Sequence, residues 1–157
     1  MHPVQLYWDD DRLYMSSKKA YVVMSRKQGT VLQQIPHDRI NSPMLAVSKQ
    51  NKCMILSNNN QGYFFDEKVG LKSQLIFRFE PEKPIVQLLL QELYVVVVYE
   101  YSVAIYNAAN GDLLEEKGKQ DKFRYKAAVG NFSSSDIYLI TNNNNQVKNA
   151  TLSEVFQ

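Results

Sequence analysis

The sequence of 157 residues has little of the residue types that most catalytic and metal sites need. Its one cysteine, Cys53, excludes an internal disulfide framework and a cysteine-rich zinc site. Two histidines, His2 and His37, leave little material for metal binding or histidine-based catalysis. The net charge of +2 creates no basic field, so the composition gives nucleic-acid binding no support.

Long apolar segments are also missing. The longest apolar run, Leu93 to Tyr99, is far shorter than the roughly 20 residues of a membrane-spanning helix. The first residues contain no extended apolar stretch, so we expect no secretory signal and a cytoplasmic, reducing environment. No segment shows the apolar stripe of an amphipathic helix. Hydrophobic residues nevertheless make up 45% of the chain, which is typical of a globular fold.

An internal repeat is the main positive signal. Three times, an apolar run ends at a Ser, Asp or Asn, and a glycine follows four positions later. Because the polar side chain can start a turn and glycine tolerates positive φ, each unit predicts a strand, a tight turn and a second strand. The three glycines, Gly29, Gly70 and Gly111, are 41 residues apart each time.

Further apolar runs precede each repeat. Together with the repeats they predict four strands per roughly 40 residues, which is the strand number and repeat length of a β-propeller blade. We therefore expect an all-β, β-propeller-like fold with about four blades of four antiparallel strands, in a single domain over residues 1–157. The first blade lacks its upstream strand unless Val4 to Trp8 supplies it. Such a chain is a small closed propeller, part of a larger ring or an open arc. The expected inner strands begin at Leu13, Cys53, Leu93 and Ile137.

One inner strand has an unusual composition. The run Val95 to Tyr99 is β-branched and aromatic throughout and lacks alternation between apolar and polar residues. It predicts a strand that is buried on both faces.

Four features in or near the expected strands are candidate functional residues. Asp9 to Asp11 form the only acidic cluster, but their spacing matches no calcium loop, which favours a solvated loop over a divalent-cation site. Cys53 lies in an apolar strand, which favours an inert core thiol over a nucleophile. His37 follows a proline and is interpreted as a solvated loop residue. Trp8 is either a partner anchor or packing for the first strand, and we favour packing.

The segment Lys117 to Lys126 carries five basic residues. It is either a surface for anionic lipid or an acidic partner, or a solvated connector, and we favour the connector. Asn131 and Asn149 each begin a glycosylation sequon that we expect to stay unmodified. No phosphate loop, metal motif or nucleophile elbow is present. The sequence therefore predicts a non-enzyme without cofactor or metal, and it leaves the partner-binding residues unassigned.

Most of the chain, residues 4 to 157, resembles a citron homology domain. The resemblance is carried by the segments KAYVVMSRKQGTVLQQI, CMILSNNNQGYFFDEKVG and EKPIVQLLLQELYVVVVYEYSVAIYNAANGDLLEE. It is strongest toward the vacuolar-sorting and TGF-β-receptor-associated branch, the subunits of the HOPS and CORVET tethers. The last blade of that branch, which precedes an α-solenoid, is similar to NFSSSDIYLITNNNNQVKNATLSEVFQ. The family domain is about twice this length, so the resemblance implies a partial domain.

This resemblance implies a non-catalytic interaction module in vesicle-mediated protein transport. Its expected partners are a Rab-type small GTPase and tethering-complex subunits, at the cytoplasmic surface of endosomes, lysosomes or the vacuole. Two alternatives stay open. The first is a citron-type regulatory module of a signalling kinase or Rho exchange factor. The second is a propeller enzyme or small-ligand binder that uses the central channel. An incomplete ring would leave the isolated chain with exposed strand edges and no function of its own.

Overall fold

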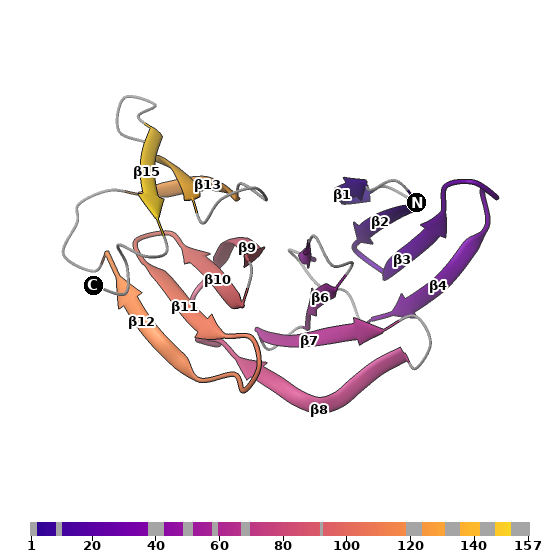
Figure 1. Cartoon of the computed structure of the whole chain (residues 1–157), viewed down its shortest axis with the longest axis horizontal. Coiled ribbons are helices and arrows are strands. Elements are labelled where there is room, and N and C mark those ends of the chain that lie inside the picture. Colours follow the sequence, from indigo (N-terminus) through magenta and orange to yellow (C-terminus); the bar gives the residue numbers. More distant parts are fainter. Residues whose placement is uncertain are drawn as a thin grey trace. The chain divides into compact units, whose positions relative to one another are not determined.

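The computed structural model describes residues 3–8, 11–37, 43–48, 52–57, 60–66, 70–91, 93–118, 124–130, 136–141 and 147–151. These residues form fifteen strands and no helix, and they consequently offer no helical segment suited to crossing a membrane. The strands make four antiparallel sheets, in each of which chain neighbours pair (Figure 1). The prediction of an all-β fold is confirmed.

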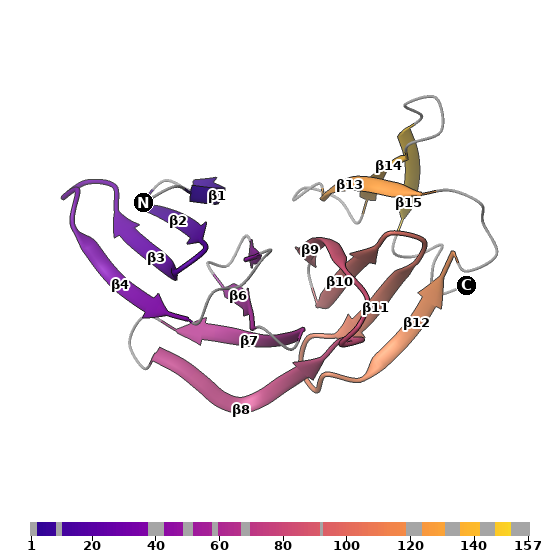
Figure 2. The same ribbon diagram turned by 180° about the vertical axis from the view of Figure 1, so that it is seen from behind.

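We call the four sheets A to D. Sheet A contains β1 (Pro3–Trp8), β2 (Arg12–Ser17), β3 (Ala20–Ser25) and β4 (Val31–Pro36). Sheet B contains β5 (Leu45–Val47), β6 (Cys53–Leu56), β7 (Gln61–Asp66) and β8 (Gly70–Arg78). Sheet C contains β9 (Ile85–Gln91), β10 (Tyr94–Tyr99), β11 (Val103–Asn107) and β12 (Leu113–Lys117). Sheet D contains β13 (Tyr125–Gly130), β14 (Asp136–Thr141) and β15 (Val147–Thr151), with β14 in the middle (Figure 2).

The chain divides into two compact units. Unit 1 contains sheets A and B, and unit 2 contains sheets C and D. The assignment of residues 1–157 to one domain stays a prediction.

The repeated glycine marks a tight turn in two of its three copies. Gly29 and Gly111 have φ values of 64° and 80°, and their amides donate to the carbonyls of Ser25 and Asn107 over 2.9 and 2.8 Å. The side chain of Asn107 also accepts a hydrogen bond from the Ala109 amide, which confirms its role in starting the turn. Gly70 differs from this expectation, because it is the first residue of β8.

The core of unit 1 lies between sheets A and B. Two side-chain hydrogen bonds join the two sheets around it: Tyr21 Oη donates to the Leu56 carbonyl over 2.6 Å, and the Leu45 amide donates to Gln5 Oε1. A third joins sheet A to the segment before β5, where Ser16 Oγ donates to the Pro43 carbonyl. They fix the register in which the apolar faces meet. The buried core residues are Tyr14, Tyr21 and Val23 of sheet A and Leu45, Cys53, Ile55 and Phe65 of sheet B.

The core of unit 2 lies between sheets C and D and is centred on β10. The side chains from Val95 to Val98 are all 0% exposed, which confirms the prediction of a strand that is buried on both faces. Burial of each valine contributes about 1.5–3 kcal/mol relative to exposure. The expected start of this strand at Leu93 is wrong, because Leu93 is 73% exposed in the turn before Tyr94. A residue in a turn does not pair with a neighbouring strand. The apolar run therefore does not show at which residue the strand begins.

The hydroxyl of Tyr21 supplies a prediction for unit 1. Burial raises the pKa of Tyr21 above its ordinary value, although hydrogen bonds to the backbone of Met44 and Leu56 oppose the shift. Above about pH 10 only the unfolded chain releases this proton. Stability from Tyr21 is therefore present below that pH and lost as the pH rises further.

We expect Tyr21→Phe to flatten the loss of stability above about pH 10 and to cost about 1–2 kcal/mol at neutral pH, because the Leu56 carbonyl loses its donor. Urea unfolding followed by circular dichroism at neutral and alkaline pH measures both effects. Tyr101→Phe, on an exposed hairpin, is the control for removal of one phenolic hydroxyl. An unchanged alkaline slope in Tyr21→Phe would contradict the assignment.

Candidate functional site

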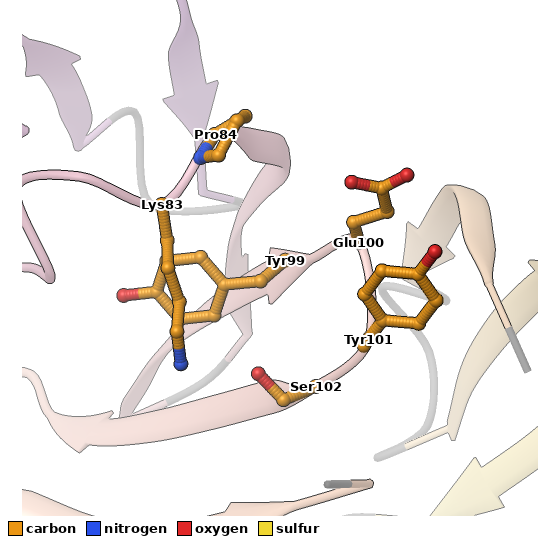
Figure 3. A pocket seen from close by; sticks show the side chains of 6 residues that line it. All are labelled: Lys83, Pro84, Tyr99, Glu100, Tyr101 and Ser102. Atoms are coloured by element: carbon orange, nitrogen blue, oxygen red, sulfur yellow. The ribbon is translucent and has the colours of Figure 1, made fainter. Parts of the chain in front are cut away.

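A small pocket opens at one end of sheet C (Figure 3). It has a volume of about 210 Å³. Its lining comes from the segment that leads into β9 and from the hairpin between β10 and β11. The lining residues are Lys83, Pro84, Tyr99, Glu100, Tyr101 and Ser102.

The pocket hairpin has a short, defined turn. The Tyr99 amide donates to the Ser102 carbonyl over 2.8 Å, so only Glu100 and Tyr101 form the loop. Tyr99 and Ser102 are buried, whereas Tyr101 is 53% exposed. The fold therefore presents one aromatic side chain to solvent from a closed two-residue loop.

The charged groups around the pocket are paired. Lys83 Nζ lies 5.4 Å from the centroid of the Tyr99 ring and 3.7 Å from Glu116 Oε1. Figure 3 shows the Lys83 side chain crossing the Tyr99 ring. Glu100 pairs with Arg124 Nε. The cation over the aromatic face stabilises both side chains and sets the direction of the lysine.

Contacts with the first strand of sheet D and with Gly118 hold this hairpin in position. The Tyr125 amide, at the start of β13, donates to the Glu100 carbonyl over 2.7 Å. Gly118 has a φ of 103°, and a Cβ atom there would lie 3.0 Å from the Tyr101 carbonyl oxygen. These contacts hold the exposed hairpin on the rigid sheets of unit 2.

The pocket lining offers two tyrosine rings with their hydroxyl groups, one ammonium group, one carboxylate and the Ser102 hydroxyl group. Such a set is suited to seating a side chain of a partner. In the described part of the chain, no three His, Cys, Asp or Glu side chains are grouped so as to hold a metal ion. The expected absence of cofactor and metal stays a prediction.

A second notable surface lies on β1. Val4, Leu6 and Trp8 alternate along this edge strand and are 51%, 56% and 63% exposed. The interpretation of Trp8 as packing for the first strand is therefore wrong. Its ring instead lies 4.9 Å beneath the Arg26 guanidinium carbon. The alternation places these side chains on the face of β1 that points away from Tyr7 and the core of unit 1.

Two of the other candidates are structural. Cys53 is 3% exposed in the core of unit 1, so its interpretation as a core thiol is confirmed. His37 is half-buried, unlike the solvated loop residue that we expected. Its Nε2 lies 3.0 Å from the Ser17 carbonyl oxygen, and its ring packs against Tyr21 at 4.9 Å between centroids.

The acidic cluster is only partly within the described residues. Asp9 and Asp10 lie outside them, while Asp11 is exposed and its carboxylate lies 3.2 Å from Lys27 Nζ. A surface ion pair of this kind contributes about 1 kcal/mol or less. The Asp11 carbonyl also accepts a hydrogen bond from the Arg26 amide. Asp11 thus links the start of β2 to the turn that follows β3.

The connector within the basic segment Lys117 to Lys126 is shorter than expected, because both ends of the segment belong to strands. Lys117 is the last residue of β12, and β13 begins at Tyr125. Residues 119–123 lie outside the described residues. Asn131 also lies outside them, and the side chain of Asn149 in β15 is not described.

The pocket itself was missed by the sequence analysis. Its signal is the sequence Tyr-Glu-Tyr-Ser directly after the valine run. The buried strand ends at the first tyrosine, and the second tyrosine follows after one charged residue. The sequence does not show that Lys83, 16 positions before Tyr99, returns to cover that ring.

The chain is similar in fold to solved structures that share little sequence with it. It aligns over 98% of its length with the β-propeller domain of Cps50 (Swd1) from Myceliophteria thermophila, with a TM-score of 0.76, 13% identity and 53% of that chain covered. The chain has a β-propeller-like fold. This confirms the predicted fold class.

Two further structures show the same likeness. BamB from Moraxella catarrhalis aligns over 94% of this chain and 42% of its own, with a TM-score of 0.73 and 12% identity. Hydrazine synthase from Kuenenia stuttgartiensis aligns over 97% of this chain and 46% of its own, with a TM-score of 0.76 and 8% identity. The chain thus spans about half the length of these structures. No protein-family model matches the sequence, and no curated protein matches it.

Gly118 supplies a prediction for the pocket. We expect Gly118→Ala to lower the free energy of unfolding by about 1–3 kcal/mol. Two effects add: an alanine is strained at this positive φ, and its Cβ atom would press against the Tyr101 carbonyl oxygen. Gly29→Ala is the matched control, since Gly29 also has a positive φ but has open space around it. Chemical denaturation measures both variants. An equal loss in the two would show that the contact behind the hairpin carries no cost.

Proposed function

We propose that this chain is a non-catalytic protein–protein interaction module of an endosomal or lysosomal vesicle-tethering subunit of the HOPS or CORVET kind. It binds a Rab-type small GTPase or fellow tether subunits through the pocket hairpin of sheet C. The observation that carries this proposal is Tyr101, which is 53% exposed on a closed two-residue loop beside the Tyr99 and Lys83 pocket.

The physical argument rests on a rigid base and an exposed aromatic anchor. Tyrosine is favoured where a few residues dominate the binding energy, because its ring buries a large area with few rotatable bonds. Here β10 and the Tyr125 amide hold the hairpin in place before any partner arrives. A preformed loop loses little conformational entropy on binding.

The branch assignment depends on the sequence resemblance. A β-propeller-like fold is compatible with a citron homology domain. The proposed partners, and the proposed location at the cytoplasmic surface of endosomes, lysosomes or the vacuole, are those of the tether branch of that family. Fold likeness alone specifies no function. The citron-type regulatory module of a signalling kinase or Rho exchange factor is the alternative, and it also is an interaction module.

The size of the pocket argues against a small-molecule receptor. Ligand sites usually have volumes of about 300–1,000 Å³. The pocket at the hairpin has about 210 Å³, and its lysine is already paired with Glu116. One side chain of a partner fits this space better than a whole ligand does.

The test is affinity capture with the tagged 157-residue chain from cells of its source, read by mass spectrometry. We expect Rab-type GTPase and tether subunits to be recovered, and Tyr101→Ser to reduce their recovery at least about tenfold, as loss of a central anchor does. Leu113→Ser is the matched control, because Leu113 is also 53% exposed but lies on β12 away from the pocket. It should leave the recovery unchanged.

Other outcomes of the capture have separate meanings. Recovery of kinase or Rho-pathway proteins that depends on Tyr101 would assign the chain to the signalling alternative. Equal losses in Tyr101→Ser and Leu113→Ser would remove the hairpin from the binding site. Recovery of chaperones alone would contradict the proposed function.

A further inference from the structure

The turn between β11 and β12 contains the one Asn-Gly pair of the sequence, Asn110 and Gly111. An asparagine before a glycine loses its side-chain amide more readily than other asparagines, because glycine has no Cβ atom to hinder attack by its own backbone nitrogen. Asn110 is exposed and Gly111 is partly exposed. Water can therefore reach the groups that such a reaction uses.

The side-chain amide of Asn110 is held in a way that favours attack on it. Its Oδ1 accepts a hydrogen bond from the Asp112 amide over 3.0 Å. When a nucleophile adds to Cγ of this side chain, negative charge develops on Oδ1, and a hydrogen-bond donor at that oxygen stabilises the charge. The Asp112 amide is thus placed to assist the addition.

The nucleophile, in contrast, is restrained. The attacking atom is the Gly111 backbone nitrogen, and its N–H donates to the Asn107 carbonyl over 2.8 Å. The Asn107 amide donates to the Asp112 carbonyl over 2.9 Å, and the Ala109 amide donates to Asn107 Oδ1 over 2.8 Å. While these bonds hold, the Gly111 nitrogen keeps its proton and stays directed at Asn107.

The turn lies at the edge of sheet C, where it can open without unfolding of the core. β12 is an edge strand, and its first two residues, Leu113 and Leu114, are 53% and 43% exposed. Segments with few buried apolar contacts open locally at a lower free energy than buried strands do. We therefore expect the turn to open far more often than the buried strand β10.

We propose that Asn110 is a site of spontaneous deamidation, and that opening of the β11–β12 turn controls its rate. In the open turn, the Gly111 nitrogen gives its proton to solvent base and forms a bond to Asn110 Cγ. The bond between Cγ and Nδ2 then breaks, and Nδ2 takes up a proton from water and leaves as ammonia. A five-membered succinimide ring remains. Water hydrolyses either carbonyl of this ring, which gives aspartate or isoaspartate at position 110.

Both products change the outer strand of sheet C. Each adds a negative charge two positions from the carboxylate of Asp112. Isoaspartate also adds a methylene group to the backbone, which displaces the Asp112 carbonyl from the Asn107 amide. Because Glu116 on β12 pairs with Lys83, loosening of this strand reaches the lysine of the pocket. The modification does not depend on the proposed function, because it uses only groups of the turn and water.

The turn between β3 and β4 is an internal control. The Gly29 amide donates to the Ser25 carbonyl over 2.9 Å, and the Ser25 amide donates to the Thr30 carbonyl over 2.8 Å, as at the equivalent positions in sheet C. The residue before Gly29 is Gln28. Its longer side chain has to close a six-membered ring, which forms far more slowly. We expect Gln28 to stay unmodified where Asn110 reacts.

The test compares deamidation with hydrogen exchange in the same 157-residue chain. Peptide mapping by mass spectrometry after incubation at mildly alkaline pH gives the rate at Asn110, in the folded chain and in urea that unfolds it. We expect folding to slow deamidation by the protection factor of the Gly111 amide, within about threefold. This factor should be at least about tenfold smaller than that of the Val96 amide, which exchanges through global unfolding.

Two variants test the chemistry and the control by the turn. Asn110→Gln, which places the residue of the sheet A turn here, should abolish the product. Asn107→Ala should raise the folded rate about two- to tenfold, because the Ala109 amide loses its acceptor, and should leave the rate in urea unchanged. The wild-type comparison decides the proposal if Asn107→Ala does not fold. A folded rate as high as that in urea, a slowing that follows Val96 rather than Gly111, or absence of both products at position 110 would overturn the proposal.

Discussion

Packing of apolar sheet faces against one another is the interaction on which the rest of this structure depends. A β-sheet with an apolar face becomes part of a stable domain by burying that face against another element. In unit 1, tyrosines of sheet A meet Ile55 and Phe65 of sheet B. In unit 2, Val96 and Val98 of sheet C pack with Ile137 and Leu139 of sheet D. Backbone hydrogen bonds set the register within each sheet, but burial between sheets stabilises the fold.

The same constraint limits where function can lie. Side chains that point between the sheets pack against one another and cannot reach a partner, as the buried thiol of Cys53 shows. Hairpins at the ends of the strands are free of that demand, and they present side chains such as Tyr101 at low cost to the core. The proposed binding site thus uses a hairpin tip, whose side chains are not needed for packing between the sheets.

Much of the fold was predictable because it is encoded locally. The turns at Gly29 and Gly111 and the buried run from Val95 to Val98 are visible in a few consecutive residues. The wrong predictions concern contacts over a distance. His37 is held by Ser17, which lies 20 positions earlier, and the exposure of Trp8 depends on which face of sheet A is covered. The pocket was missed for the same reason, because Lys83 and Tyr99 meet only in the folded sheet.

Native-state hydrogen exchange tests this account most directly. If face-to-face burial stabilises the fold, the amides of β6 and of Val95 to Val98 exchange only through global unfolding. The amides of the edge strands β4 and β12, whose side chains are largely exposed, should exchange at least about a hundredfold faster. Uniform exchange across inner and edge strands, or early exchange of the valine strand, would contradict the claim that burial between sheets holds the structure together.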